Sequence, residues 1–183
     1  MLIREVTDVI ERFAPLAWQE SYDNAGLIVG RPDDEVHRAL LAVDVTDEVM
    51  AEAEREGCDM VITHHPIVFH ALKRFNSADQ VQRCVERAIR GGIALYACHT
   101  NLDSAPGGMS WRLAEMLGVG DLRVLQPAQA DEKVGFGVVG ELPEPMATVE
   151  FMRRMQRVLG VRVVRHSDIA SPEVRRVAVC TGA

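Results

Sequence analysis

The sequence predicts an α/β fold, a layered mixed sheet with βαβ units. Short apolar runs rich in β-branched residues alternate with helix-length amphipathic segments, which favours parallel βαβ units over a bundle or a sandwich. The chain has 183 residues, of which 48% are hydrophobic, so it is long enough to bury a sizeable core. We therefore expect strands in the interior and helices packed on their faces.

The first third of the chain opens with a helix and continues with two strands. We predict an amphipathic helix that Pro15 ends, because apolar residues recur at helical spacing: Leu2, Val6, Val9, Ile10 and Phe13. A turn and a strand follow within residues 22–30, and residues 39–45 form the next apolar strand. Thr46 is suited to cap a helix that ends near Gly57.

The middle of the chain contains two buried strands that each run into histidines. Residues 60–63 are apolar and lead directly to a His-His-Pro turn, whose proline opposes continuation as a helix. Ser77 and Gln80 have the spacing of a capping box and predict a helix that ends at residues 91–92. The strand predicted over residues 93–98 then empties into a loop with the sequence His-Thr-Asn-Leu-Asp at 99–103.

The last third predicts one helix, a pair of strands, a second helix and two further strands. A helix follows Pro-Gly-Gly at 106–108 and ends at Leu117. Strands are expected over 124–126 and 134–141, and the prolines of segment 142–145 mark a boundary. Apolar residues at helical spacing predict a helix over 149–159, and two strands are expected after it, over 161–165 and 174–180.

The composition excludes several classes of protein. No apolar run approaches the roughly 18 residues of a membrane-spanning helix, and the N-terminal residues do not resemble a secretion signal. The formal net charge of −7 disfavours a broad nucleic-acid surface. The four cysteines lack Cys-x-x-Cys spacing, so we interpret them as reduced thiols of a cytoplasmic protein.

Polar residues at the ends of the two buried strands form the candidate site, because ligands collect at the carboxyl ends of strands in open α/β sheets. His64 and His65 are adjacent, so in extended backbone their rings should point to opposite sides and suit two neighbouring metal ions better than one. Asp103 could bridge two such ions. His99 could ligate a metal or only orient the ligands.

Each of these residues also has a plainer interpretation. The histidine pair could cap the strand and bond to backbone, and Asp103 could be an ordinary loop or N-cap residue. His37, His70 and His166 are expected on the surface. The arginines of residues 153–157 suit an exposed helix face better than a phosphate site. Cys98 beside His99 does not predict a nucleophile and base, because neighbouring side chains on a strand point apart.

Four segments together resemble the Nif-three-like family of GTP cyclohydrolase 1 type 2 homologues. They are DNAGLIVG at 23–30, ITHHPIVF at 62–69, HTNLDSAPGG at 99–108 and GELPEP at 140–145. The resemblance covers essentially the whole chain, and it implies a single family domain over 1–183 with two lobes and a lobe boundary near 120–145. It further implies a toroidal homohexamer and a dinuclear metal centre with His64, His65 and Asp103 as ligands.

The sequence departs from the family pattern at one point. The family completes its metal site with a C-terminal histidine and a glutamate four residues later, and none of the six histidines here is followed by such a glutamate. The resemblance therefore implies a family member without the C-terminal segment, with fewer ligands and weaker metal binding. Zinc, iron, manganese and nickel all suit imidazole and carboxylate ligands.

The functional expectation is a metal-dependent hydrolase that acts on a nucleotide-like or phosphate-bearing small molecule, with no catalytic residue assigned. The alternative from another class is a non-catalytic, ring-forming metal-binding or regulatory scaffold. A third interpretation is a non-catalytic α/β domain whose histidines are satisfied polar residues. An assay of turnover with and without a chelator separates the first two interpretations, and metal content tests the third.

Overall fold

The computed structural model describes residues 1–182, which form two compact units. The first unit is Met1–Leu102 and the second begins at Asp103, so the division falls inside the short helix α4 (Thr100–Ser104). Residues 120–145, near which the sequence predicts a lobe boundary, lie within the second unit. Each unit contains its own sheet and its own hydrophobic core.

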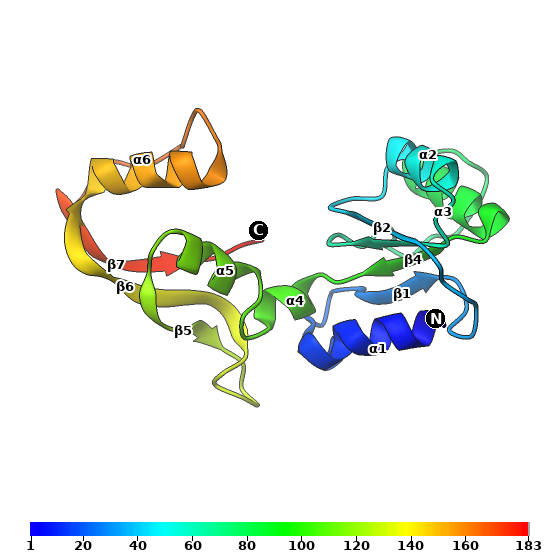
Figure 1. Ribbon diagram of the computed structural model, residues 1–183, viewed down its shortest axis with the longest axis horizontal. Helices are drawn as coiled ribbons and strands as arrows, with labels where there is room; N and C mark the ends of the chain where they lie inside the picture. The colour runs from blue at the N-terminus through cyan, green and yellow to red at the C-terminus, as the bar shows by residue number, and fades with distance from the viewer. Residues whose placement is uncertain (183) are drawn as a thin grey trace. The chain divides into compact units, whose positions relative to one another are not determined.

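The first unit is a four-stranded mixed sheet in the order β1-β4-β3-β2, with helices on both faces (Figure 1). Strands β2, β3 and β4 are parallel, and β1 pairs with β4 in the antiparallel direction. Helices α2 and α3 connect the parallel strands as βαβ units, as predicted, and α1 lies on the opposite face. The elements are α1 (Ile3–Phe13), a 3-10 helix (Leu16–Trp18), β1 (Gly26–Val29), β2 (Ala39–Ala42), α2 (Asp47–Arg55), β3 (Met60–Thr63), α3 (Gln80–Gly91) and β4 (Ala94–Ala97).

The core of the first unit lies between the sheet and helices α2 and α3. Val61 and Leu95 pair across β3 and β4 and are almost fully buried. Because side chains alternate along a strand, these residues face α2 and α3 while Tyr96 faces α1. The Tyr96 hydroxyl donates a hydrogen bond to Glu11 of α1. The remaining members of this core are Val45, Met50, Ala53, Cys58, Cys84, Ala88 and Ile93.

Two helix starts in this unit test the capping predictions. Thr46 caps α2 as predicted, because its hydroxyl accepts a hydrogen bond from the Val49 amide. The capping box at Ser77 and Gln80 is wrong: the cap of α3 is Asp79, whose carboxylate accepts from the Gln82 amide. Ser77 has a positive φ of 57°, outside the extended backbone that an N-cap needs.

Ion pairs join the exposed sides of α2 and α3. Arg83 Nη2 lies 2.7 Å from Asp47 Oδ2, and Arg87 Nη2 lies 2.6 Å from Glu54 Oε2. The hydrogen bond from Arg83 holds the pKa of Asp47 below its ordinary value, and Arg87 lowers the pKa of Glu54 in the same way. Both carboxylates therefore add stability above their unfolded pKa that disappears as the pH falls through their folded pKa.

We expect Arg87→Ala to lower the free energy of unfolding at neutral pH by a small amount, because exposed pairs contribute little. The difference between parent and variant should shrink as the pH falls through the lowered pKa of Glu54, where this carboxylate takes up its proton. Urea unfolding across this range measures it. In a Glu54→Gln background the same substitution should show much less pH dependence, and an equally steep dependence there would contradict the assignment.

The second unit is a three-stranded antiparallel sheet in the order β5-β6-β7, on which two helices pack (Figure 1). Its core contains Ala114 of helix α5 and Leu117, the C-cap of that helix. These residues pack with Val138, Phe151 and Val177. The elements are α5 (Met109–Met116), β5 (Gly120–Pro127), β6 (Gly135–Ala147), α6 (Thr148–Leu159) and β7 (Glu173–Val179).

Two predictions in this unit are wrong. The segment 142–145 is not a boundary, because β6 continues through it to Ala147; the prolines are accommodated where the pairing with β7 shifts register between Glu141 and Met146. Residues 161–165 form no strand. In the part of the chain that the structure describes, they pair with neither sheet, and Val163 is 77% exposed. Within residues 1–182, no helix combines the length and the apolarity needed to cross a bilayer.

Candidate metal centre

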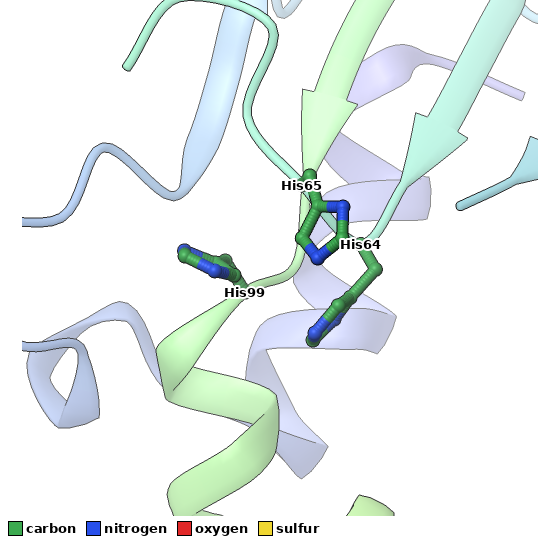
Figure 2. Close-up of side chains that lie close together, drawn as sticks. All are labelled: His64, His65 and His99. Atoms are coloured by element: carbon green, nitrogen blue, oxygen red, sulfur yellow. The ribbon is translucent and has the colours of Figure 1, made fainter. Parts of the chain in front are cut away.

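Three histidines gather where the two central strands of the first unit end. Strands β3 and β4 are parallel and in register, with Thr63 opposite Ala97, so the segments that follow the two strands leave the sheet at the same edge. His64 and His65 follow β3 directly, and His99 follows β4 after one intervening residue. This is the edge at which the sequence predicts a site. Figure 2 shows the three side chains close together at this edge.

One nitrogen from each of the three rings lies within 4.8 Å of the others. The ring centroids are 4.9 Å apart for His64 and His65, 5.3 Å for His64 and His99, and 5.6 Å for His65 and His99. The prediction that adjacent histidines point to opposite sides is therefore wrong. Alternation holds only in extended backbone, and the chain bends directly after Thr63, whose hydroxyl donates to the carbonyl of His65.

Each of the three rings has an oxygen partner at Nδ1. His64 Nδ1 lies 2.9 Å from the carbonyl oxygen of Cys98, His65 Nδ1 lies 2.7 Å from Asp44 Oδ1, and His99 Nδ1 lies 2.7 Å from Asp23 Oδ1. A carbonyl or an ionised carboxylate can only accept, so Nδ1 carries the proton in all three. A neutral ring protonated at Nδ1 has its lone pair on Nε2, which is the form that ligates a metal.

Asp23 is the most enclosed of these oxygen partners. Its side chain is fully buried, while that of His99 is 18% exposed. Besides the proton of His99, its carboxylate accepts hydrogen bonds from the amides of Asn24 and Thr100 and from the Thr100 hydroxyl. Burial raises the pKa of Asp23, but these hydrogen bonds together lower it further, so the net pKa lies below the ordinary value and the group is ionised at neutral pH.

Asp44 accepts the Nδ1 proton of His65 in a more solvent-exposed position. The side chains of His65 and Asp44 are 49% and 58% exposed, so water competes for this contact. The backbone amide of His65 also donates to the carbonyl of Val43, which holds the bend after β3 against the end of β2. The His65 ring is thus fixed by one side chain and by the chain path around it.

The donor set fits a first-row divalent cation. Three imidazoles, two of them hydrogen-bonded at Nδ1 to a carboxylate, make the arrangement in which histidine is ordinarily found around zinc, iron or nickel. The plainer interpretation, a histidine that caps the strand and bonds to backbone, describes only the Nδ1 contact of His64. It does not account for three convergent rings.

Asp103, the remaining predicted ligand, belongs to the second unit. It lies in the helical turn α4 instead of the expected loop, and it is 3% exposed. Its carboxylate accepts a hydrogen bond from the Thr181 hydroxyl, and the α-carbon of Gly182 packs beside it, since a Cβ there would lie 3.0 Å from Asp103 Oδ2. Its role as a bridging ligand stays a prediction.

The surface predictions for other polar residues are confirmed except at one arginine. His37, His70 and His166 are exposed. Arg153 and Arg157 are exposed and pair with Glu150 of the same helix, as on a solvated face, but Arg154 is half-buried and donates a hydrogen bond to the carbonyl of Leu117. Sequence reasoning missed Asp23 and Asp44 as partners of the histidines. The available signals were the position of Asp44 just after β2 and that of Asp23 at the head of the family segment 23–30, beside β1.

The chain was then compared with known proteins. A family model described as Duf34/NIF3 (NGG1p interacting factor 3) matches residues 1–183. The chain belongs to the Duf34/NIF3 family. This confirms the family resemblance that the four sequence segments carry, and with it the mixed α/β fold.

Curated relatives of this Duf34/NIF3 chain are longer than the chain itself. The GTP cyclohydrolase 1 type 2 homolog of Clostridium perfringens is 31% identical over 182 residues, which are 100% of this chain and 70% of the relative. The protein of the same name from Streptomyces coelicolor is 35% identical over 187 residues, covering 98% of this chain and 65% of the relative. The chain thus spans about two thirds of the length of such relatives.

Solved structures agree on the fold. A Bacillus cereus protein related to NIF3 superimposes with a TM-score of 0.92 at 23% identity, covering 100% of this chain and 77% of that one. Reduced HcgD from Methanocaldococcus jannaschii superimposes with a TM-score of 0.74 at 30% identity, covering 86% of this chain and 60% of that one. The first likeness concerns the fold alone, because its identity is low.

Proposed function

We propose that this chain binds divalent metal ions through His64, His65 and His99 and acts as a metal-dependent hydrolase on a nucleotide-like or phosphate-bearing substrate. The observation that carries the proposal is the convergence of three imidazoles, each oriented through Nδ1 by an oxygen acceptor. The names of the relatives, GTP cyclohydrolase 1 type 2 homolog, support a nucleotide as the substrate class. We propose two ions per chain, with Asp103 as a further ligand.

In the first unit, the proposed metal ligands and the residues that orient them are different side chains. The three histidines supply neutral nitrogen donors, and Asp23 and Asp44 keep two of the rings in the ligating tautomer. A bound divalent ion would supply Lewis acidity and would lower the pKa of a water molecule, which is the chemistry that hydrolysis at neutral pH needs. A cytoplasmic location is part of the proposal, and the four free thiols among the described residues support it.

The test is the metal content per chain, measured by elemental analysis after desalting. We expect the parent to retain bound metal and His64→Ala, His65→Ala and His99→Ala each to lose most of it. His166→Ala is the matched control, because this exposed histidine lies outside the cluster. A parent without metal, or cluster variants that keep as much as the control, would refute the metal site.

Turnover decides between the hydrolase and a ring-forming scaffold. Exposed apolar side chains on and beside the edge strand β2, Leu41 at 74% and Val43 at 61%, support assembly into a homo-oligomer, for which we propose the hexamer. Hydrolysis of GTP or of a phosphate ester by the metal-loaded chain, abolished by a chelator, supports the hydrolase. A metal-loaded oligomer of hexameric mass without turnover supports the scaffold.

A further inference from the structure

Two exposed aromatic side chains stand beside the histidine cluster. Tyr22 is 62% exposed and Phe69 is 40% exposed, and their ring centroids lie 6.4 Å apart with planes at 63°. The Phe69 centroid is also 6.2 Å from that of His99, with planes at 84°. We call Tyr22 and Phe69 the aromatic platform. The Phe69 ring of the platform is therefore the neighbour of a candidate metal ligand, His99.

The platform and the cluster are connected through the consecutive residues Tyr22, Asp23 and Asn24, which lie just before strand β1. Tyr22 supplies one ring of the platform, and the next residue, Asp23, orients His99. Asn24 follows, and its side-chain amide donates a 2.7 Å hydrogen bond to the carbonyl of Val68, directly before Phe69. These consecutive residues thus connect both platform segments to His99, so the platform is placed relative to the cluster before any ligand binds.

The exposure of these rings is unlike that of the aromatic side chains in the two cores. Tyr96 is 1% exposed and Phe151 is 7% exposed. Burial of aromatic area is among the larger stabilising contributions that a side chain makes, and neighbouring exposed aromatics are typical of binding surfaces. Phe69 also meets the His70 ring edge to face, with centroids 5.2 Å apart. The exposed part of the Tyr22 and Phe69 rings is the surface on which a further planar group can stack.

We propose that the aromatic platform stacks the planar base of a nucleotide-like substrate while the substrate's oxygen atoms reach the metal held by His64, His65 and His99. This inference rests on the proposed function and adds the residues that select the substrate. Stacking on an aromatic ring accepts any base and contributes an affinity that a sugar phosphate lacks. The step is binding only, and no bond is made or broken in it.

The test compares a nucleotide with the sugar phosphate that carries a hydroxyl in place of the base. Guanosine 5′-monophosphate and ribose 5-phosphate are titrated calorimetrically into the zinc-loaded chain, and metal content is measured for every variant. We expect Phe69→Leu and Tyr22→Leu to weaken guanosine 5′-monophosphate about tenfold each and to leave ribose 5-phosphate unchanged. Phe13→Leu is the matched control, because Phe13 is 50% exposed on α1 and is not part of the platform.

The outcomes separate the platform from the metal site. Unchanged metal content with base-dependent losses in both platform variants supports the inference. The inference fails when the platform variants bind guanosine 5′-monophosphate like the control, when both probes bind the parent equally, or when neither binds. A parent without zinc refutes the proposed function, and the platform is then judged alone by whether Phe69→Leu weakens the nucleotide in the metal-free chain.

Discussion

Asp23→Ala is expected to lower the affinity of the histidine cluster for a divalent cation by about 10- to 100-fold, although Asp23 need not touch the ion. Without this carboxylate, the Nδ1 proton of His99 has no fixed acceptor, so the ring can turn and can exchange its tautomer. The loss should be large because the Asp23 side chain is fully buried and water cannot easily take its place.

Asp44→Ala is the matched control for this prediction. It removes the same kind of contact from His65, but the Asp44 side chain is 58% exposed, so water can accept the Nδ1 proton instead. Competition with a metal-sensitive dye measures both affinities, and Asp23→Asn, which keeps one acceptor oxygen, should fall between the parent and Asp23→Ala. Equal losses in the two alanine variants would show that burial of the carboxylate does not set its importance.

Tyr96→Ala is expected to lower the free energy of unfolding of the first unit by about 3–5 kcal/mol, the range for deleting a buried aromatic side chain. The Tyr96 ring is 1% exposed on the central strand β4, where it faces α1. The substitution leaves a cavity between the sheet and the helix and removes the partner of Glu11. Tyr96→Phe keeps the ring and should lose only about 1 kcal/mol.

The measurement must report on the first unit alone. The chain has two tryptophans, Trp18 in the first unit and Trp111 in the second. In a Trp111→Phe background, the fluorescence of Trp18 follows the first unit during urea unfolding. A loss for Tyr96→Ala no greater than that for Tyr96→Phe would mean that the packing of the ring contributes little there.

Local patterns predict the elements of the first unit well because each is specified by neighbours in sequence. The strand over residues 60–63 and the cap at Thr46 follow from apolar runs and from a hydroxyl at the right position. Predictions fail where a tertiary partner decides. Residues 161–165 have strand composition but join neither sheet of residues 1–182. Strand β6 passes through its prolines because β7 pairs on both sides of them.

The candidate site was predictable in place but not in geometry. Parallel strands bring His64 and His99 to one edge, and that much follows from the pattern alone. The direction of the rings depends on a bend after β3 and on Asp23 and Asp44, which lie 76 and 21 positions from their histidines. No local rule links residues so far apart, so these partners emerge only from the folded chain.

One of the three orienting contacts belongs to the main chain: the acceptor for His64 is the carbonyl oxygen of Cys98. Any amino acid at position 98 offers the same oxygen, so sequence drift there leaves the acceptor in place as long as β4 keeps its path. Systematic side-chain mutagenesis would accordingly detect the contributions of Asp23 and Asp44 and would not detect that of the Cys98 carbonyl. Its contribution would emerge only from editing the backbone itself, for example by replacing a peptide bond with an ester.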